Sequence, residues 1–184
     1  MSCRDNEELQ RFVEEAKKVA KDGKVASYIP ALAKADQTDL SVAVYHVSNT
    51  CHSAGDVDKR FTLQSISKVL ALALVLSEEG PKKVFQFVGQ EPTGDPFNSM
   101  IKLETASPNK PLNPMINAGA LAVTSLIRGA TPQDQLNRLL GFIRELANDK
   151  SITYCKETAA SEFETSMINR AMCYYMKQYH IIRG

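Results

Sequence analysis

The sequence lacks a hydrophobic run long enough to cross a membrane. Its longest apolar run covers residues 69–76, well below the roughly 18 residues that a membrane-spanning helix needs. The N-terminus is too charged for a secretory signal peptide. With 22 Lys and Arg against 21 Asp and Glu, the formal net charge is +1, which gives no electrostatic footprint for nucleic acid or an acidic membrane. We therefore expect a soluble, cytoplasmic protein that acts on a small molecule.

Cysteine is also sparse, and its spacing excludes the common metal and redox motifs. The chain has four cysteines, Cys3, Cys51, Cys155 and Cys173. Because no two of them form a C-x-x-C pair, free thiols are expected rather than a disulfide framework. His46, Cys51 and His52 lie close together in the sequence, but no second pair supplies zinc-ligand spacing. Neither a metal nor a cofactor is expected.

What remains is the composition of one ordinary globular domain. A chain of 184 residues with 43% hydrophobic and 23% charged residues can bury a real core. Hydrophobic spacing and turn residues predict helices over 6–21, 66–79, 81–88, 117–127, 132–148 and 161–178, with strands over 40–47 and 51–55. Residues 89–114 are proline-rich and are expected to form a loop, and residues 149–157 a linker. The fold class is therefore α+β, mostly helical, with one early two-strand hairpin.

The motif Ser65-Ile66-Ser67-Lys68 lies where a polar segment gives way to the long apolar run. If a helix starts there, Ser65 and Lys68 fall three residues apart on one face, so the lysine amine can take the proton of the serine. Burial lowers the pKa of a lysine, and the positive end of a helix macrodipole disfavours its ammonium form. The motif indicates a hydrolase nucleophile at the buried start of a helix.

Two other interpretations of this motif have to be weighed. Ser65 could simply cap a core helix, with Lys68 as a solvated first-turn residue. The spacing alone is weak evidence, because Ser107-Pro108-Asn109-Lys110 repeats it, although its proline places that segment in an extended loop.

The second interpretation is an enzyme that reacts with β-lactams. Penicillin-recognising enzymes share the Ser-Lys geometry and also carry S-x-N and K-T-G elements. Here Met115-Ile116-Asn117 lacks the serine and Thr93-Gly94 follows a proline, so a serine enzyme acylated by β-lactams is disfavoured.

Glu162 and Asn169 are seven residues apart on the last predicted helix. That spacing is two turns, so both side chains fall on one face, where they could hold an ammonium group and a carboxylate or amide. The predicted start of this helix is a capping box at Ser161-Glu162-Phe163-Glu164. The alternative is ordinary solvated polarity on a helix surface.

Four short segments are spread over much of the chain, and their order and spacing carry a resemblance. They are Phe61-Thr62-Leu63-Gln64-Ser65-Ile66-Ser67-Lys68, Pro92-Thr93-Gly94-Asp95-Pro96-Phe97-Asn98-Ser99, Asn113-Pro114-Met115-Ile116-Asn117-Ala118-Gly119-Ala120, and Ser161-Glu162 with Asn169-Arg170-Ala171. In combination they resemble the serine-dependent glutaminases. The resemblance implies hydrolysis of L-glutamine to L-glutamate and ammonia on a fold like that of β-lactamases and penicillin-binding proteins. It also implies a homo-oligomer, a dimer or a tetramer.

The resemblance assigns roles to individual residues. Ser65 would attack the side-chain amide while Lys68 helps to move its proton, and water would later release the glutamyl ester. The substrate-binding set would comprise Tyr28, Ser65, Asn117, Glu162 and Asn169. In that set Glu162 suits an α-ammonium group, the asparagines suit the α-carboxylate and the side-chain carbonyl, and Tyr28 lines the pocket.

The sequence departs from the family pattern at its C-terminal end. Family members continue well past the helix of Asn169, and the resemblance implies that this part supplies two further tyrosines, an oxyanion-hole position and the remaining strands. Tyr174, Tyr175 and Tyr179 lie too early to replace those tyrosines. We therefore expect residues 1–184 to be a single, C-terminally truncated glutaminase domain with a partial fold, weak or inactive alone, since two strands leave an unpaired edge. A non-catalytic glutaminase-like fragment that binds an amino acid or a partner chain is the alternative.

Overall fold

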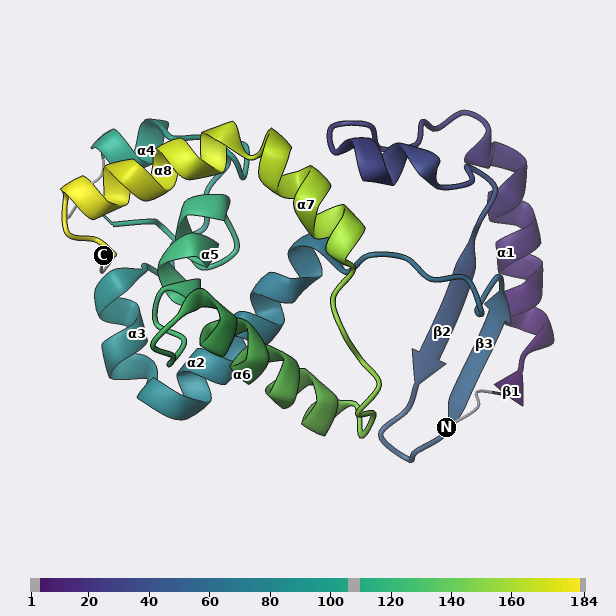
Figure 1. Ribbon diagram of the computed structural model, residues 1–184. Coiled ribbons are helices and arrows are strands. Elements are labelled where there is room, and N and C mark those ends of the chain that lie inside the picture. The colour runs from purple at the N-terminus through teal and green to yellow at the C-terminus, as the bar shows by residue number, and fades with distance from the viewer. Residues whose placement is uncertain (1–3, 106–109, 183–184) are drawn as a thin grey trace. The chain divides into compact units, whose positions relative to one another are not determined.

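The computed structural model describes residues 4–105 and 110–182 of the chain (Figure 1). The chain forms two compact units. Unit 1 comprises Met1–Thr62 and Cys155–Thr165, and unit 2 comprises Leu63–Tyr154 and Ser166–Gly184. No helix among the described residues is both long and apolar enough to span a bilayer. The mostly helical α+β class predicted from the sequence is confirmed, whereas a single domain over residues 1–184 stays a prediction.

Unit 1 contains a small sheet, one long helix and two short helical segments. Its elements are β1 (Arg4–Asp5), α1 (Glu7–Ala20), the 3-10 helix η1 (Pro30–Lys34), β2 (Ser41–Tyr45), β3 (Cys51–Gly55) and α7 (Lys156–Thr165). Helix α1 packs on the sheet through buried Val13. Its first turn is capped by the Asn6 side chain, whose Oδ1 accepts the Leu9 N–H at 3.0 Å. The predicted amphipathic first helix is therefore confirmed within two residues of its expected ends.

The predicted hairpin forms, but the sheet has a third strand. Strands β2 and β3 pair antiparallel, with Val44 opposite His52. Strand β1 adds to the other side of β3 in parallel, so the strand order is β1-β3-β2. The expectation of two strands is therefore wrong. Strand β1 consists of two charged residues. It is too short to show the alternation of apolar and polar residues by which strands are recognised in a sequence.

Cysteine pairing also differs from the expectation. Cys155 and Cys173 are free thiols. Cys51, in β3, is disulfide-bonded, so the prediction of four free thiols is wrong for this residue. Cys3 lies outside the described residues.

Unit 2 is helical. Its elements are the 3-10 helix η2 (Gln64–Ile66), α2 (Ser67–Glu79), α3 (Pro81–Phe87), α4 (Ile101–Thr105), α5 (Asn117–Thr124), α6 (Pro132–Leu146) and α8 (Met167–Gln178). Helix α6 starts as predicted, with Pro132 in its first turn and Thr131 as N-cap, and a capping box with Asp134 satisfies two further backbone N–H groups. The loop predicted over residues 89–114 is interrupted by α4.

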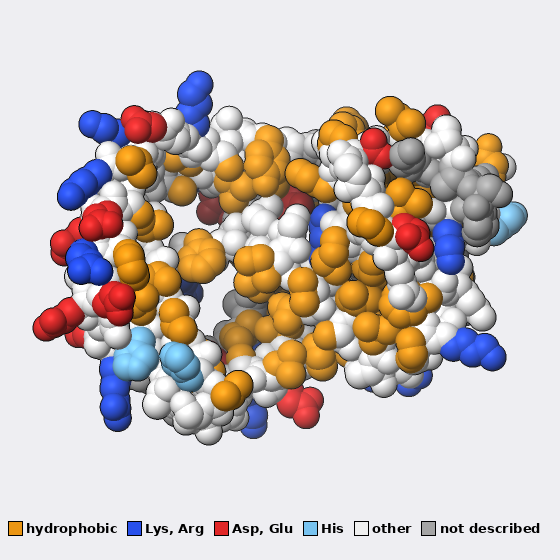
Figure 2. All heavy atoms as spheres, turned by 180° about the vertical axis from the view of Figure 1, so that it is seen from behind, with side chains coloured by type: hydrophobic (Ala, Val, Ile, Leu, Met, Phe, Trp, Pro, Cys, Tyr) orange, Lys and Arg blue, Asp and Glu red, His pale blue; other side chains and the backbone are white. Residues whose placement is uncertain are grey.

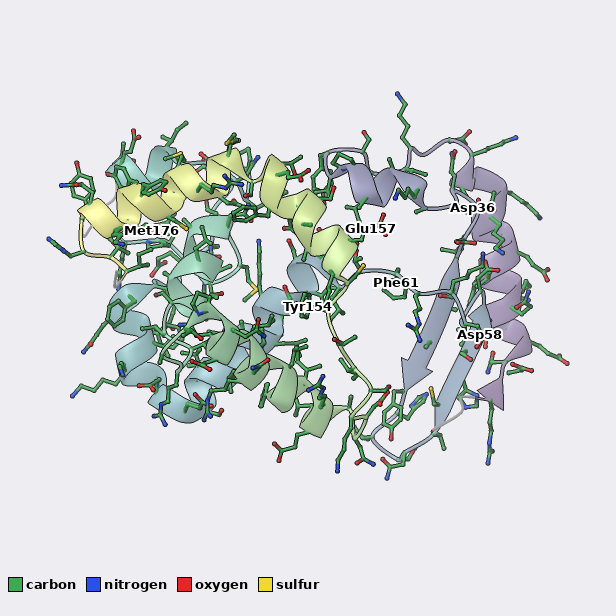
Figure 3. The ribbon with its side chains drawn as sticks, in the orientation of Figure 1. Asp36, Asp58, Phe61, Tyr154, Glu157 and Met176 are labelled. Atoms are coloured by element: carbon green, nitrogen blue, oxygen red, sulfur yellow. The ribbon has the colours of Figure 1, made fainter. Side chains whose placement is uncertain are left out.

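Helix α5 contributes residues to two separate hydrophobic clusters. On one side Val123 packs with buried residues of α2 and α3, among them Val75 and Val84. On the other side Ala118 and Ala122 pack with a cluster that includes α4 and α8. The small side chains of α5 allow this close approach from both sides. Met176 of α8, labelled in Figure 3, is fully buried in the second cluster.

Helix α2 buries only part of its surface. Ala71, Leu74 and Val75 are buried, but Ile66 and Val69 at its start are more than half exposed. The apolar run over residues 69–76 is therefore only partly buried. Figure 2 shows hydrophobic side chains over much of the visible surface of unit 2, at the right of the view. Exposed large hydrophobic residues of this unit also include Leu63, Phe97, Ile101, Met115, Leu146, Tyr154, Met167, Ile168, Tyr174 and Tyr179.

The last predicted helix, over residues 161–178, is two helices. Helix α7 ends at Thr165 and α8 begins at Met167. The Thr165 hydroxyl donates to the backbone carbonyls of Ser161 and Glu162, a back-bond that competes with helix propagation. The predicted capping box is also wrong, because α7 already starts at Lys156 and Ser161 lies in its interior. Glu162 and Asn169 are consequently on different helices, in different units, and do not share one helix face.

Candidate active site

Ser65 lies in η2, the short 3-10 helix that runs directly into α2. Gln64, the residue before it, has a φ of 43°, in the left-handed region that side chains other than glycine adopt at an energetic cost. The Gln64 carbonyl accepts the Ser67 hydroxyl at 2.7 Å, and the Ser67 N–H caps the same turn. The backbone around Ser65 is therefore held in a strained turn, and such strain concentrates at functional sites.

The Ser65 side chain is exposed. This differs from the expectation of a nucleophile at a buried helix start. The cause is the exposed start of α2 described above, where Ile66 and Val69 also face away from the core. Within the described part of the chain, the apolar run of α2 packs only its later turns against α3, α5 and α6.

Lys68 is half-buried in the first turn of α2, and its amine has two oxygen acceptors. Nζ lies 2.9 Å from the Met115 carbonyl oxygen and 2.8 Å from Asn117 Oδ1. It also lies 5.5 Å from the centroid of the Phe97 ring, within the range of a cation–π contact. These contacts fix the amine at the start of α2, three residues from Ser65.

The asparagine pair extends this network to α8. Asn117 is the first residue of α5, and its Nδ2 donates to Asn169 Oδ1 at 3.1 Å. Because Oδ1 of Asn117 accepts from Lys68, the amide can point only its NH₂ group toward Asn169. The structure thus brings together three of the residues that the sequence indicated, Lys68, Asn117 and Asn169, from three different helices of unit 2.

The loop before α5 supports the network through its backbone. The Asn113 side chain accepts the N–H groups of Met115 and Ile116 at 2.9 and 3.2 Å. The Asn117 N–H donates to the Phe97 carbonyl at 2.8 Å. Gly119 allows the loop to approach α5, because a Cβ there would lie 1.8 Å from the Asn113 carbonyl oxygen. The position of the Met115 carbonyl therefore depends on a contact that only glycine permits.

Burial has one electrostatic consequence at this site. It lowers the pKa of Lys68 below the ordinary lysine value, because a charged ammonium is disfavoured where water is excluded. The direction is the one that a proton acceptor needs, since only the neutral amine can take a proton from a hydroxyl. The site can therefore combine an exposed hydroxyl, an amine with a lowered pKa and two amides.

The other two residues that the sequence indicated, Tyr28 and Glu162, belong to unit 1. Tyr28 is 68% exposed and lies just before η1, and Glu162 is exposed on α7. Within this unit their segments are tied together, because the Ala31 N–H of η1 donates to Ser161 Oγ of α7 at 3.1 Å. The structure therefore places the two segments side by side in one unit.

Three contacts were not assigned from the sequence, two in unit 2 and one in unit 1. They are the Phe97 ring, the Met115 carbonyl and the Ser161 hydroxyl. Phe97 and Met115 lie inside the family-like segments, so the sequence marked their positions but assigned them no function. Ser161 was assigned to a helix cap instead.

No group of three or more metal-ligating side chains occurs in residues 4–105 and 110–182. His46 and His52 stack edge to face at 6.2 Å between ring centroids, on the hairpin of unit 1. Three residues of the second Ser-Lys pattern, 107–109, lie outside the described residues.

Comparison with known proteins places the chain in a class. The family model for glutaminase matches residues 23–184. Glutaminase 2 of Bacillus subtilis strain 168 is 70% identical over 181 residues, which cover 98% of this chain and 59% of that protein. The glutaminase of Geobacillus thermodenitrificans strain NG80-2 is 60% identical over 182 residues, 99% of this chain and 59% of that protein. Both relatives are named glutaminases.

A solved structure gives the same result. The Bacillus subtilis glutaminase YbgJ, in covalent complex with 5-oxo-L-norleucine formed from 6-diazo-5-oxo-L-norleucine, matches with a TM-score of 0.79 and 31% identity, over 95% of this chain and 53% of that one. The chain therefore belongs to the glutaminase family. It spans about 59% of the length of the curated relatives named above.

Proposed function

We propose that the chain carries the nucleophilic part of a glutaminase that hydrolyses L-glutamine to L-glutamate and ammonia. The observation that supports this most directly is the hydrogen-bond network of Lys68, Asn117 and Asn169, whose lysine lies three residues after Ser65 in the sequence. It lies inside the segment that matches the glutaminase family, residues 23–184. A relative with 31% identity forms a covalent complex with 5-oxo-L-norleucine, a ligand whose first five carbons match a glutamyl group and which carries one further carbon beyond the ketone.

In the proposed reaction, Ser65 Oγ attacks the δ-carbonyl carbon of L-glutamine. Lys68, whose pKa is lowered by burial, accepts the serine proton and returns it to the departing nitrogen, so that ammonia leaves and a glutamyl ester forms. Water then attacks the ester carbonyl and gives its proton to the same amine. The ester bond breaks, L-glutamate leaves and Ser65 recovers its proton.

The remaining residues are proposed to hold the substrate. Asn117 and Asn169 offer amide donors and acceptors for the α-carboxylate and the side-chain carbonyl. Glu162 suits the α-ammonium group, because an ionised carboxylate makes the stronger, charge-assisted hydrogen bond with a cation. Tyr28 is proposed to line the pocket. A β-lactamase-like architecture, a cytoplasmic location and a homo-oligomer, dimer or tetramer, are also proposed, on the family resemblance alone.

Ammonia release from L-glutamine tests the proposal. We expect the 184-residue chain to release ammonia slowly, and Ser65→Ala to abolish release without changing the circular dichroism of the chain. Ser77→Ala is the matched control on α2, since its hydroxyl donates only to the Leu74 carbonyl one turn earlier. Release that persists in Ser65→Ala would exclude Ser65 as nucleophile. Binding of L-glutamate with no release by the unmodified chain would instead favour a non-catalytic binding role.

A further inference from the structure

We propose that Ser161 is a positioning residue for the two segments of unit 1 that carry Tyr28 and Glu162, acting through η1 and α7. Its hydroxyl accepts the backbone N–H of Ala31 at 3.1 Å, and both residues belong to unit 1. The inference rests on the proposed function, because the segments that Ser161 connects carry Tyr28 and Glu162. It adds a residue with no assigned role to that site.

Helix η1 needs an acceptor from elsewhere at its start. Its N-cap is Ile29, whose side chain has no oxygen, and no side-chain cap is present. Pro30, the first residue of η1, has no N–H, so Ala31 carries the first N–H that requires a partner. In most helices the N-cap side chain supplies this acceptor. Here Ser161 supplies it from the interior of α7, which lies 130 residues away in the sequence.

A second contact joins the same two elements, and a buried residue lies directly before η1. Lys34, the last residue of η1, forms an ion pair with Glu157 of α7, which is labelled in Figure 3. Both side chains of this pair are largely exposed, so the ion pair by itself contributes little stability. Ile29 beside η1 is only 3% exposed. The hydroxyl of Ser161 is therefore the directional contact that sets how η1 lies on α7.

The sequence neighbours of this hydrogen bond give it a functional meaning. Glu162 follows Ser161 directly on α7, and Tyr28 precedes Pro30 by two residues. One hydroxyl thus fixes the two segments that carry the proposed ammonium-binding carboxylate and the pocket tyrosine. Without it the Ala31 N–H loses its acceptor and the two segments can shift against each other. Ser65 and Lys68 keep their own contacts in unit 2, so the effect falls on ligand affinity rather than on the reactive groups.

The test separates affinity from reactivity with 6-diazo-5-oxo-L-norleucine, which labels a relative covalently. In the 184-residue chain, labelling kinetics give the inhibition constant KI and the maximal labelling rate. We expect Ser161→Ala to raise KI about three- to tenfold, because that is the effect of losing one hydrogen bond. The maximal labelling rate should stay within twofold. Ser161→Thr keeps the hydroxyl and should show the same KI as the unmodified chain. Lys34→Ala, which removes the neighbouring exposed ion pair, leaves KI unchanged.

Amide hydrogen exchange at Ala31 provides a readout that does not depend on activity. We expect faster exchange at Ala31 in Ser161→Ala and normal protection in Ser161→Thr. Faster exchange with an unchanged KI would overturn the positioning role while leaving the proposed function intact. A maximal labelling rate that falls while KI rises would show general damage to the fold and would also overturn the positioning role. If the unmodified chain is neither labelled nor binds L-glutamate, the proposed function itself fails and the role of Ser161 fails with it.

Discussion

Lys68 Nζ lies 2.8 Å from Asn117 Oδ1, although the two residues are 49 positions apart in the sequence. The contact joins the first turn of α2 to the first residue of α5. It fixes the amine in the first turn of α2, three residues after Ser65 in the sequence, and at the same time orients the amide whose other end reaches Asn169. One asparagine therefore connects the proposed proton-transfer group to the proposed substrate-binding amides.

Activity is expected to rise with pH through the pKa of Lys68. Burial lowers this pKa, so the neutral, proton-accepting amine appears below the ordinary lysine value of about 10.4. An arginine cannot lose its proton, so Lys68→Arg should lower kcat/KM at least about 100-fold at every pH. A pH profile of ammonia release measures both effects.

The matched control for that substitution is Lys110→Arg. Lys110 Nζ also donates to a backbone carbonyl of unit 2, that of Phe85, at 2.8 Å, but it has no proposed part in the chemistry. Its substitution should leave the profile unchanged. An Lys68→Arg enzyme with a normal profile would show that Lys68 does not accept the proton.

Asn117 and Asn169 should act as a coupled pair in ligand binding. Removing either amide breaks their shared hydrogen bond of 3.1 Å, so the second removal should cost less than the first. We expect Asn117→Ala, Asn169→Ala and the double variant to show a coupling of about 0.5–1.5 kcal/mol in L-glutamate affinity. Calorimetric titration gives the three affinities. Strictly additive losses would mean that the two amides bind the ligand independently.

Gly119 should tolerate no side chain, whereas Gly141 should accept one. A Cβ at Gly119 would lie 1.8 Å from the Asn113 carbonyl oxygen, and one at Gly141 would meet nothing within 4 Å. Gly119→Ala should therefore destabilise the fold by more than about 2 kcal/mol and displace the Met115 carbonyl from Lys68. Gly141→Ala, inside α6, should stabilise it by about 0.5–1 kcal/mol. Urea denaturation compares the two, and equal stabilities would contradict the close approach of loop and helix.

The strained Gln64 should matter for activity more than for stability. Gln64→Gly removes the cost of a φ of 43° but also frees the unfolded chain, so the free energy of unfolding should change by less than about 1 kcal/mol. The turn that aims Ser65 loses its rigidity, and ammonia release should fall. Asn148→Gly, at a φ of 49° beyond the end of α6, should change stability by a similar amount and leave activity unchanged. A fully active Gln64→Gly chain would show that the strain has no catalytic role.

Much of the fold was predictable because local signals agreed with the packing. The amphipathic pattern of α1, the Thr131-Pro132 start of α6 and the β-hairpin over residues 41–55 all formed as expected. Three features depend on contacts that the sequence does not show. Strand β1 exists only through its pairing with β3. Helix α7 ends at Thr165 and α8 begins at Met167, so one predicted helix is two. The Ser161 hydroxyl caps η1, 130 residues away in the sequence, instead of the helix that contains it.

Only part of the candidate site that the sequence indicated lies together in the structure. Lys68, Asn117 and Asn169 meet in unit 2 through hydrogen bonds, and the roles of all the indicated residues stay predictions. The shared face of Glu162 and Asn169 was wrong because it assumed one continuous helix, and the helical period carries no information about a break at Ser166. Exposure of Ser65 was likewise missed, since an apolar run does not show which of its turns is covered.

The most direct measurement is the position of the covalent adduct after reaction with 6-diazo-5-oxo-L-norleucine. We expect mass spectrometry of peptides to find the 5-oxo-L-norleucine group on Ser65, formed as N₂ leaves and the serine proton moves to the diazo carbon, and absent in Ser65→Ala. The competing nucleophile is Cys155, an exposed thiol whose pKa is lowered by hydrogen bonds from the Thr158 hydroxyl and backbone. An adduct on Cys155, or one that persists in Ser65→Ala, would contradict the assignment of Ser65 as the nucleophile.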